Sequence, residues 1–350
     1  MIKRLLAGIF WIVVSIRHCL YNSGILKSTE FDFPVICVGN LAVGGTGKTP
    51  HTEMLIRLFQ KEGIKFAALS LGYKRRSKGF LYADKDSTAQ MVGDEPCQVK
   101  RQFPDAIVAV CKSRVEGIKR IKKDYADVQV VILDDAMQHR QVKPGMTILL
   151  TTCDKIVTQD HMLPWGTLRD IPSRYTHADM VMVTKCPENI TPIDLSVLKK
   201  ELRLKPCQWL FFTAYTYGTP LQLSSNEPLK DIPKSGSVLA LAGIAKPQPF
   251  FDYVKKTYTL AHTFRFADHH NFSKQELDAI AKKVQGMPDG VLFTTEKDAA
   301  RLADSSLPAE VKERIYYIPI QVNFLNNGEK EFSQKTIQYV RENKKISIFC

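Results

Sequence analysis

The sequence predicts an α/β fold: a parallel sheet covered by helices, followed by a second, smaller α/β unit. Three observations lead to this prediction. Short apolar runs of strand length alternate with segments of helical periodicity between residues 34 and 185. A glycine-rich loop separates the first such run from the first helical segment. A length of 350 residues with 44% hydrophobic content is enough to form two cores.

The chain begins with an apolar segment, "LLAGIFWIVVSI" at residues 5–16, which has Lys3 and Arg4 before it and Arg17 after it. As a helix this run reaches about 18 Å, whereas the hydrocarbon core of a membrane is about 30 Å thick. A full span is therefore not expected unless the helix extends through its polar flanks. Two interpretations remain: a buried core helix, or a helix in a membrane interface anchored by Trp11 and the flanking cations, which we favour. Residues 1–27 are accordingly predicted to form a membrane-associated helix.

The next elements follow from periodicity. The run at 34–40 predicts a buried strand, and residues 49–63 predict a helix with apolar positions at Met54, Leu55, Leu58 and Phe59. Further strands are expected at 65–71, 106–111, 128–134, 146–152 and 180–185, which gives a first domain at 28–212. The aromatic, alternating segment that starts near residue 207 predicts antiparallel strands leading to a second domain at 213–350.

The loop "AVGGTGKT" has the Walker pattern for binding phosphate, with alanine in the first position. Its glycines allow tight turns and a close approach of backbone N–H groups to phosphate. Lys48 supplies a cation for the β and γ phosphates, the hydroxyl of Thr49 can ligate Mg²⁺, and the following helix directs its positive end to the same place. The predicted nucleotide-binding residues of this loop are Ala42, Val43, Gly44, Gly45, Thr46, Gly47, Lys48 and Thr49.

A metal carboxylate is expected on a neighbouring strand. The apolar run at 128–134 ends in Asp134, and Asp135 follows it, so both are candidate Mg²⁺ ligands. The sequence "VTKCP" places Lys185 after another strand, where guanine-binding proteins carry N-K-x-D, but Pro187 stands where the acid would be. This difference disfavours GTP.

A kinase also needs a group that accepts the proton of the acceptor hydroxyl. Asp94 and Glu95 lie in a glycine turn before a predicted helix, and Asp268, His269 and His270 precede another helix in the second domain. A carboxylate from one domain and a histidine from the other can meet across a cleft. The residues alone leave helix capping by Asp94 and an ordinary loop position for His269 as alternatives.

Composition limits the partners. The formal net charge of +13 favours an anionic partner, which could be nucleic acid, an acidic membrane surface or a phosphorylated substrate. The eight cysteines include no C-x-x-C pair, so a disulfide framework or zinc site is not expected, and buried thiols in a reducing cytosol are predicted.

These motifs together resemble one family. The runs "VGNLAVGGTGKTP", "GDEP", "DDAMQHR", "LPWGTLRD", "VTKCP", "LAGIAKPQPF", "FADHHNFS" and "TTEKDAARL" are similar to those of tetraacyldisaccharide 4'-kinase, and they cover residues 35–302 in one order. The resemblance implies transfer of the γ-phosphate of ATP, with Mg²⁺, to the 4'-hydroxyl of a tetraacylated glucosamine disaccharide 1-phosphate in lipid A synthesis. It also implies a two-lobed protein held at the cytosolic face of the bacterial inner membrane by its N-terminal helix. We expect a monomer without a nucleic-acid partner.

The resemblance also assigns roles to individual residues. Lys48 and Thr49 would serve ATP and Mg²⁺, Asp94 would be the general base, and His269 would be its partner. Asp134 and Asp135 would form the metal site, with Gln138 and His139 lining it. Arg169 would be a cation near the transferred phosphoryl group or the lipid.

Two other functions use similar features. A nucleotide-driven switch or metal-delivery protein is built on the same loop, but it needs a guanine motif or a metal-ligand cluster, and the sequence has neither. A nucleic-acid-dependent ATPase fits the charge, but it needs a basic face interleaved with aromatic residues, which the sequence also lacks.

Overall fold

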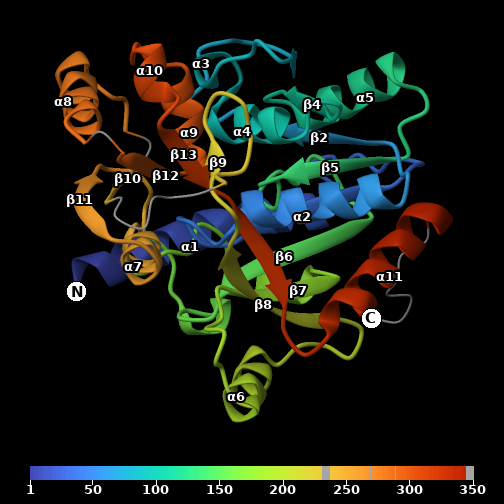
Figure 1. Ribbon diagram of the computed structural model, residues 1–350. Helices are drawn as coiled ribbons and strands as arrows, with labels where there is room; N and C mark the ends of the chain where they lie inside the picture. Colours follow the sequence, from blue (N-terminus) through green and yellow to red (C-terminus); the bar gives the residue numbers. More distant parts are fainter. Residues whose placement is uncertain (231–236, 269, 288, 344–350) are drawn as a thin grey trace.

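The fold consists of two β-sheets with helices packed against them (Figure 1). The computed structural model describes residues 1–230, 237–268, 270–287 and 289–343. The larger sheet has nine strands in the order β14-β8-β7-β6-β1-β5-β2-β4-β3, and the smaller has five in the order β11-β10-β12-β13-β9. We call the larger sheet with its helices the first lobe and the smaller sheet with its helices the second lobe. The predicted α/β class is confirmed.

The first lobe is built around parallel strands. The central pairs β1–β5, β1–β6, β6–β7, β7–β8, β2–β5 and β2–β4 are all parallel, whereas β3 and β14 add antiparallel edges. Its strands are β1 (Val35–Asn40), β2 (Phe66–Ser70), β3 (Leu81–Ala83), β4 (Ile107–Val110), β5 (Val130–Asp134), β6 (Met146–Thr152), β7 (Met180–Thr184), β8 (Trp209–Tyr217) and β14 (Ile320–Phe324).

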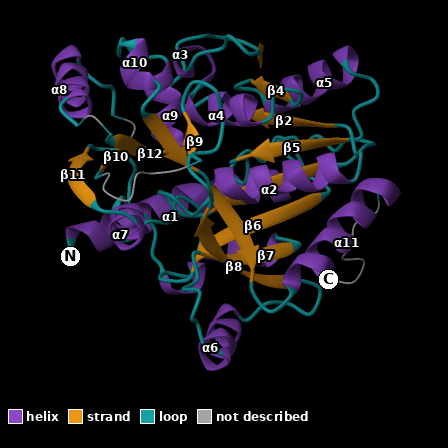
Figure 2. Ribbon diagram, viewed as in Figure 1, coloured by secondary structure: helices purple, strands orange, loops and turns teal. Residues whose placement is uncertain are grey.

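Both faces of this sheet are covered by helices (Figure 2). Alternate residues of β1 enter different cores: Val35 and Cys37 pack with α1, α5 and α6, while Ile36 and Val38 pack with α2, α4 and α11. This double burial explains why the strands are apolar runs and not alternating patterns. The helices are α1 (Ile2–Asn22), α2 (Lys48–Lys61), α3 (Ala89–Val92), α4 (Asp94–Gln102), α5 (Arg114–Asp124), α6 (Pro192–Leu202) and α11 (Gly328–Glu342), with 3₁₀ turns η1 (Val157–Gln159) and η2 (Pro172–His177).

The second lobe is a smaller sheet covered on both faces. One core contains α8, α9 and α10, and the other contains α7. The strands are β9 (Leu221–Gln222), β10 (Val238–Ala242), β11 (Leu260–Arg265), β12 (Val291–Thr295) and β13 (Ile315–Ile318). The helices are α7 (Gln248–Thr257), α8 (Lys274–Gln285), α9 (Glu296–Ala303) and α10 (Ala309–Lys312).

The chain crosses between the lobes twice. After β8 it enters the second lobe, and after β13 it returns, because β14 pairs with β8 and the apolar side of α11, with Phe332 and Tyr339, packs on the first sheet. The two crossings touch, since the Gly218 N–H donates to the Pro319 carbonyl at 2.8 Å. The sequence analysis assigned all of 213–350 to the second domain. In the structure, residues 320–342 of this range pack with the first sheet.

Polar side chains make several of the contacts between the lobes. Arg101 of α4 forms an ion pair with Asp304, and the Gln102 amide donates to Glu296 of α9 at 3.0 Å. On another side of the interface, Lys246 Nζ lies 2.7 Å from Asp154 Oδ2.

Helix α1 is longer than the apolar run from which it was predicted. It spans 21 residues because the polar flanks continue the helix, and it is the one helix in the described ranges that is long and apolar enough to cross a membrane. Ala7, Val14 and His18 face the first lobe, and His18 Nε2 lies 2.5 Å from Asp170 Oδ1. The exposed apolar side chains are Ile2, Leu5, Leu6, Ile9, Trp11, Ile12, Val13 and Ile16. This exposure rules out the buried core helix.

The cysteines largely behave as expected. Cys37, Cys97, Cys111 and Cys186 are buried as free thiols. Cys207 is disulfide-bonded, which the sequence analysis did not anticipate.

Candidate active site

The glycine loop lies between β1 and α2, as the sequence predicts. Gly44 and Gly47 have φ angles of +104° and +95°, a region that glycine enters without steric cost. Position 47 also has no room for a side chain, since a Cβ there would lie 1.7 Å from Tyr215 Oη. The pattern of glycines therefore reflects both the turn and the close packing of β8 against the loop.

Hydrogen bonds from three segments hold the loop. The buried Asn40 amide donates to Thr46 Oγ1 at 2.6 Å, and the Thr184 hydroxyl at the end of β7 donates to the Thr46 carbonyl at 2.8 Å. The Val43 N–H donates to the Thr167 carbonyl at 2.8 Å, which places the "LPWGTLRD" segment along the loop. These hydrogen bonds therefore fix the backbone of the loop.

A buried histidine connects the loop to β8. His51 Nδ1 lies 2.8 Å from the Gly47 carbonyl oxygen, and Nε2 lies 3.1 Å from the hydroxyl of Thr213. Because a carbonyl only accepts, Nδ1 carries the proton and Nε2 accepts from Thr213. Burial lowers the pKa of His51 to about 4, so the ring is neutral at physiological pH.

Charged side chains gather at the carboxyl end of β1 and β5. Lys48 Nζ lies 3.7 Å from Asp135 Oδ2, and Arg169 forms an ion pair with the same carboxylate. Arg169 Nη2 also donates to Asn40 Oδ1 at 2.7 Å. The structure thus brings together Lys48, Asp135 and Arg169, three of the residues predicted for the site.

Asp134, the last residue of β5, is buried beside this cluster. Burial raises its pKa to about 7, and the negative charges of Glu95 and Asp135 act in the same direction. Lys48 and Arg114 oppose the rise. Carboxylate oxygens are ligands that Mg²⁺ prefers, and a divalent cation would offset the burial of Asp134, so Asp134 and Asp135 fit the role of Mg²⁺ ligands. Thr49, the second residue of α2, belongs to the same end of the sheet.

Gln138 and His139 lie in the turn after β5. The side-chain amide of Gln138 donates to the Asn40 carbonyl at 2.9 Å. The main-chain carbonyl of Gln138 accepts from Arg17 of α1 at 2.7 Å. Gln138 thus connects the N-terminal helix to the start of the glycine loop. Burial lowers the pKa of His139, with a smaller contribution from Arg114.

Asp94 begins α4, directly after Gly93 at φ +98°. A Cβ on Gly93 would lie 3.0 Å from Gly72 Cα, so the turn before Asp94 packs on the backbone after β2. The negative charge of Glu95, the next residue, acts to raise the pKa of Asp134, in agreement with a position of this turn near the end of β5.

The histidine partner predicted for Asp94, His269, lies outside the described residues. Its neighbours are described: Lys297 Nζ donates to Asp268 Oδ1 at 2.9 Å, and His270 Nε2 lies 2.9 Å from Glu276 Oε2. The pairing of Asp94 with His269 stays a prediction.

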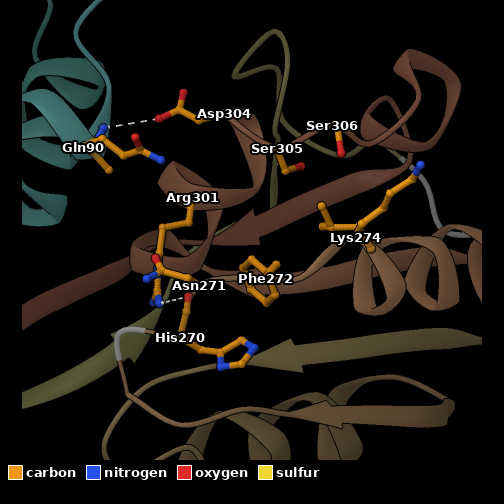
Figure 3. Close-up of a pocket in the computed structure, with 11 residues that line it drawn as sticks. Gln90, His270, Asn271, Phe272, Lys274, Arg301, Asp304, Ser305 and Ser306 are labelled. Carbon is orange, nitrogen blue, oxygen red and sulfur yellow. Dashed lines mark hydrogen bonds between the residues drawn. The ribbon is translucent and has the colours of Figure 1, made fainter.

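A cavity of about 320 Å³ opens between the lobes near His270. Gln90 of α3 comes from the first lobe, whereas the other labelled side chains, Arg301 and Lys274 among them, come from the second (Figure 3). None of the described residues predicted for catalysis or nucleotide binding lines this cavity. We therefore do not include it in the site.

Sequence reasoning missed several supporting residues. Asn40 and His51 hold the glycine loop, Arg114 donates to the main-chain carbonyl of Asp134 at 3.4 Å, and all three are almost completely buried. A polar residue within an apolar strand, as in "VICVGN", and an arginine on the buried side of a helix are the signals that could have indicated Asn40 and Arg114. His51 gave no such signal, because its partner Thr213 is 162 residues away.

Comparison with known proteins agrees with this geometry. The sequence model of a family described as "Tetraacyldisaccharide-1-P 4'-kinase" matches residues 1–340. The chain belongs to this family. A tetraacyldisaccharide 4'-kinase of Phocaeicola vulgatus is 44% identical over 99% of this chain and 98% of its own length. One of Flavobacterium johnsoniae is also 44% identical, over 96% of each chain.

A solved structure has the same fold. The crystal structure of LpxK from Aquifex aeolicus, determined in complex with ATP, superimposes with a TM-score of 0.76 over 96% of this chain and 97% of its own. Its sequence identity is 24%, so this comparison supports the fold alone. Family membership confirms the predicted enzyme class, an ATP-dependent kinase, and does not favour the switch or metal-delivery alternative.

Proposed function

We propose that this kinase transfers the γ-phosphate of ATP to the 4'-hydroxyl of a tetraacylated glucosamine disaccharide 1-phosphate, the reaction named for its relatives. One observation supports this most directly. The glycine loop, the β5 carboxylates and the Asp94 turn all lie at one end of the first sheet, so a phosphate donor, a metal and a proton acceptor have a common site.

The residues suggest a division of labour. The loop N–H groups and Lys48 bind the β and γ phosphates and hold the chain of phosphates in one orientation. Thr49, Asp134 and Asp135 would hold Mg²⁺, which neutralises charge on the phosphates when bound. Arg169 is positioned by Asn40 and Asp135 to face the transferred group.

Asp94 would accept the proton of the 4'-hydroxyl as the phosphoryl group is transferred. His269 would orient this carboxylate from the second lobe. A carboxylate can accept a proton, and Asp94 lies at the first turn of α4, where the helix dipole favours negative charge.

We further propose that α1 attaches the enzyme to the cytosolic face of the inner membrane. Leu5, Ile9 and Ile16 are all more than half exposed, on a helix whose opposite side is fixed to the first lobe. An acylated substrate is itself held in the membrane, so such an attachment brings its headgroup to the glycine loop.

Vesicle co-sedimentation tests the attachment. The triple variant Ile9→Ser, Ile12→Ser, Ile16→Ser should lose most of its binding to anionic vesicles. The pair Ile193→Ser, Val197→Ser removes exposed apolar side chains from α6 and should bind like the wild type. Equal binding by the triple variant and the wild type would contradict the proposal.

The catalytic proposal is tested by phosphate transfer. Protein in detergent is given Mg²⁺, γ-labelled ATP and the tetraacyl disaccharide 1-phosphate. Transfer is followed by the label on the lipid, and ³¹P NMR of the product locates the new phosphate. Label on the 4'-oxygen supports the proposal. Release of inorganic phosphate alone, with or without the lipid, would sink it.

A further inference from the structure

A second lysine near the glycine loop is Lys185, which directly follows β7. Strand β7 lies on one side of β1 in the sheet order and β5 lies on the other, so Lys185 and Asp135 approach the loop from opposite sides. Each is the residue after the last strand position, and both have a left-handed backbone, with φ of +57° and +50°. For residues other than glycine this conformation is uncommon and is found preferentially at functional sites.

The Lys185 amine is directed at the loop. Its Nζ lies 3.7 Å from the position of a Cβ built on Gly45 and 5.9 Å from the ring centroid of Tyr215, whose hydroxyl packs against Gly47. The preceding residue, Thr184, is bonded to the Thr46 carbonyl, so the base of the side chain is fixed against the same loop.

This amine has no anionic partner in the described part of the chain. The other two lysines nearby are paired: Lys48 with Asp135 at 3.7 Å, and Lys246 with Asp154 at 2.7 Å. Around Lys185 no described carboxylate lies within the 4.0 Å limit of an ion pair. Its side chain is partly buried, and burial, together with Lys246 and Lys48, lowers its pKa, whereas the more distant charge of Asp154 acts in the opposite direction.

An unpaired cation that loses water and sits beside other cations is unfavourable without a ligand. A ligand that compensates must be anionic and must lie within reach of Gly45. The phosphate chain of the nucleotide meets both conditions, because the loop N–H groups bind it at this place.

We propose that Lys185 is a second lysine that binds the phosphate chain of the nucleotide, from the β7 side of the loop and opposite the Asp135 side. The inference rests on nucleotide binding by the glycine loop and not on the identity of the acceptor lipid. It gives the "VTKCP" segment a role in phosphate binding, in place of the base recognition that N-K-x-D performs.

The test is a set of binding measurements by calorimetry on the full-length protein. Lys185→Met keeps the length of the side chain and removes its charge, and Lys185→Arg keeps the charge. Lys199→Met, an exposed lysine of α6, is the matched control. The probes are Mg²⁺–ATP, Mg²⁺–tripolyphosphate, which has no ribose or base, and adenosine, which has no phosphate.

We expect Lys185→Met to weaken ATP and tripolyphosphate by about the same factor, ten- to a hundredfold, which is the usual effect of losing a hydrogen bond to a charged group. Adenosine binding should be unchanged, and Lys185→Arg should recover part of the loss. The melting temperature of the free protein should not fall, because removing an unpaired, partly buried charge does not destabilise the fold.

Three results would overturn the proposal. ATP binding could be unchanged in Lys185→Met. ATP and adenosine could weaken while tripolyphosphate does not, which would place the contact at the ribose or base. A lower melting temperature, with equal losses for all three probes and no recovery in Lys185→Arg, would indicate a structural role. The binding measurements contain no lipid, so they test the role of Lys185 even if the protein does not phosphorylate the lipid.

Discussion

The contact between His51 and the glycine loop gives the sharpest quantitative prediction. The ring is 1% exposed and makes two hydrogen bonds, at 2.8 Å to the Gly47 carbonyl and at 3.1 Å to Thr213. In His51→Ala the Gly47 carbonyl still accepts the backbone N–H of residue 51, at 3.2 Å in the native chain, so it is not left without a donor. The Thr213 hydroxyl, however, loses the one partner that the described residues provide for its side chain.

The expected loss can be worked out from these contacts. One hydrogen bond contributes about 1 kcal/mol, and a buried hydroxyl left unsatisfied costs about 1–3 kcal/mol. His51→Ala should therefore lower the free energy of unfolding by about 2–4 kcal/mol. Thr213→Val, which removes the hydroxyl at nearly constant volume, should lower it by about 1–2 kcal/mol. The double variant should be less destabilised than the sum, with a coupling of about 1 kcal/mol.

Urea unfolding followed by tryptophan fluorescence measures these values. The chain has three tryptophans, and replacing Trp11 and Trp165 by Phe leaves Trp209 of β8 as the reporter. His51→Asn is the control, because its neutral amide can still donate to the Gly47 carbonyl. Additive effects in the double variant, or single variants within about 0.3 kcal/mol of the wild type, would refute the reasoning.

Three further predictions concern the same lobe. Glu53 is 0% exposed and faces Arg57, Gln98, Glu296 and Asp134. Burial raises its pKa well above the usual value. The folded state therefore holds this proton more tightly than the unfolded state, and stability falls as pH rises through the window above the ordinary pKa. Glu53→Gln should raise the melting temperature relative to the wild type more at pH 8.5 than at pH 5.5, and an equal difference at both pH values would contradict this. Arg169→Lys should lower kcat about tenfold or more, because an ammonium cannot reproduce the guanidinium contacts with Asn40 and Asp135. Wild-type kinetics in this variant would show that a positive charge alone is enough for the role of Arg169. Gly93 has φ at +98°, and a Cβ there would lie 3.0 Å from Gly72 Cα. Gly93→Ala should therefore destabilise the protein by about 1–2 kcal/mol in a thermal or urea assay and reduce kcat by displacing Asp94. Unchanged stability would mean that the turn adapts to the side chain.

Local patterns predicted the centre of the site well. The apolar run at 34–40, the glycines and the helix after them are contiguous in sequence, and the structure has β1 and α2 at nearly the same bounds. The position of Asp134 and Asp135 followed from a second strand of the same kind, because the carboxyl ends of parallel strands meet at one edge.

Contacts between distant segments could not be predicted in this way. The periodicity of residues 328–342 indicates a helix, but the choice of sheet on which Phe332 and Tyr339 pack depends on the pairing of β14 with β8, about 100 residues earlier. The hydrogen bond between His51 and Thr213 likewise joins residues that are far apart in the sequence. The span of α1 exceeds the apolar run at 5–16 because polar residues on both sides continue the helix.

The most direct test of the account is the rate of a single phosphate transfer in Asp94→Asn. ATP is saturating, the lipid is in detergent micelles, and the reaction is stopped by rapid quenching. Asp86→Asn, an exposed carboxylate a few residues upstream, is the control and should match the wild type. We predict a rate at least about a hundredfold lower in Asp94→Asn, with ATP affinity within twofold of the wild type, as expected for loss of a general base. Transfer by Asp94→Asn at nearly the wild-type rate would contradict the proposed role of Asp94 as general base.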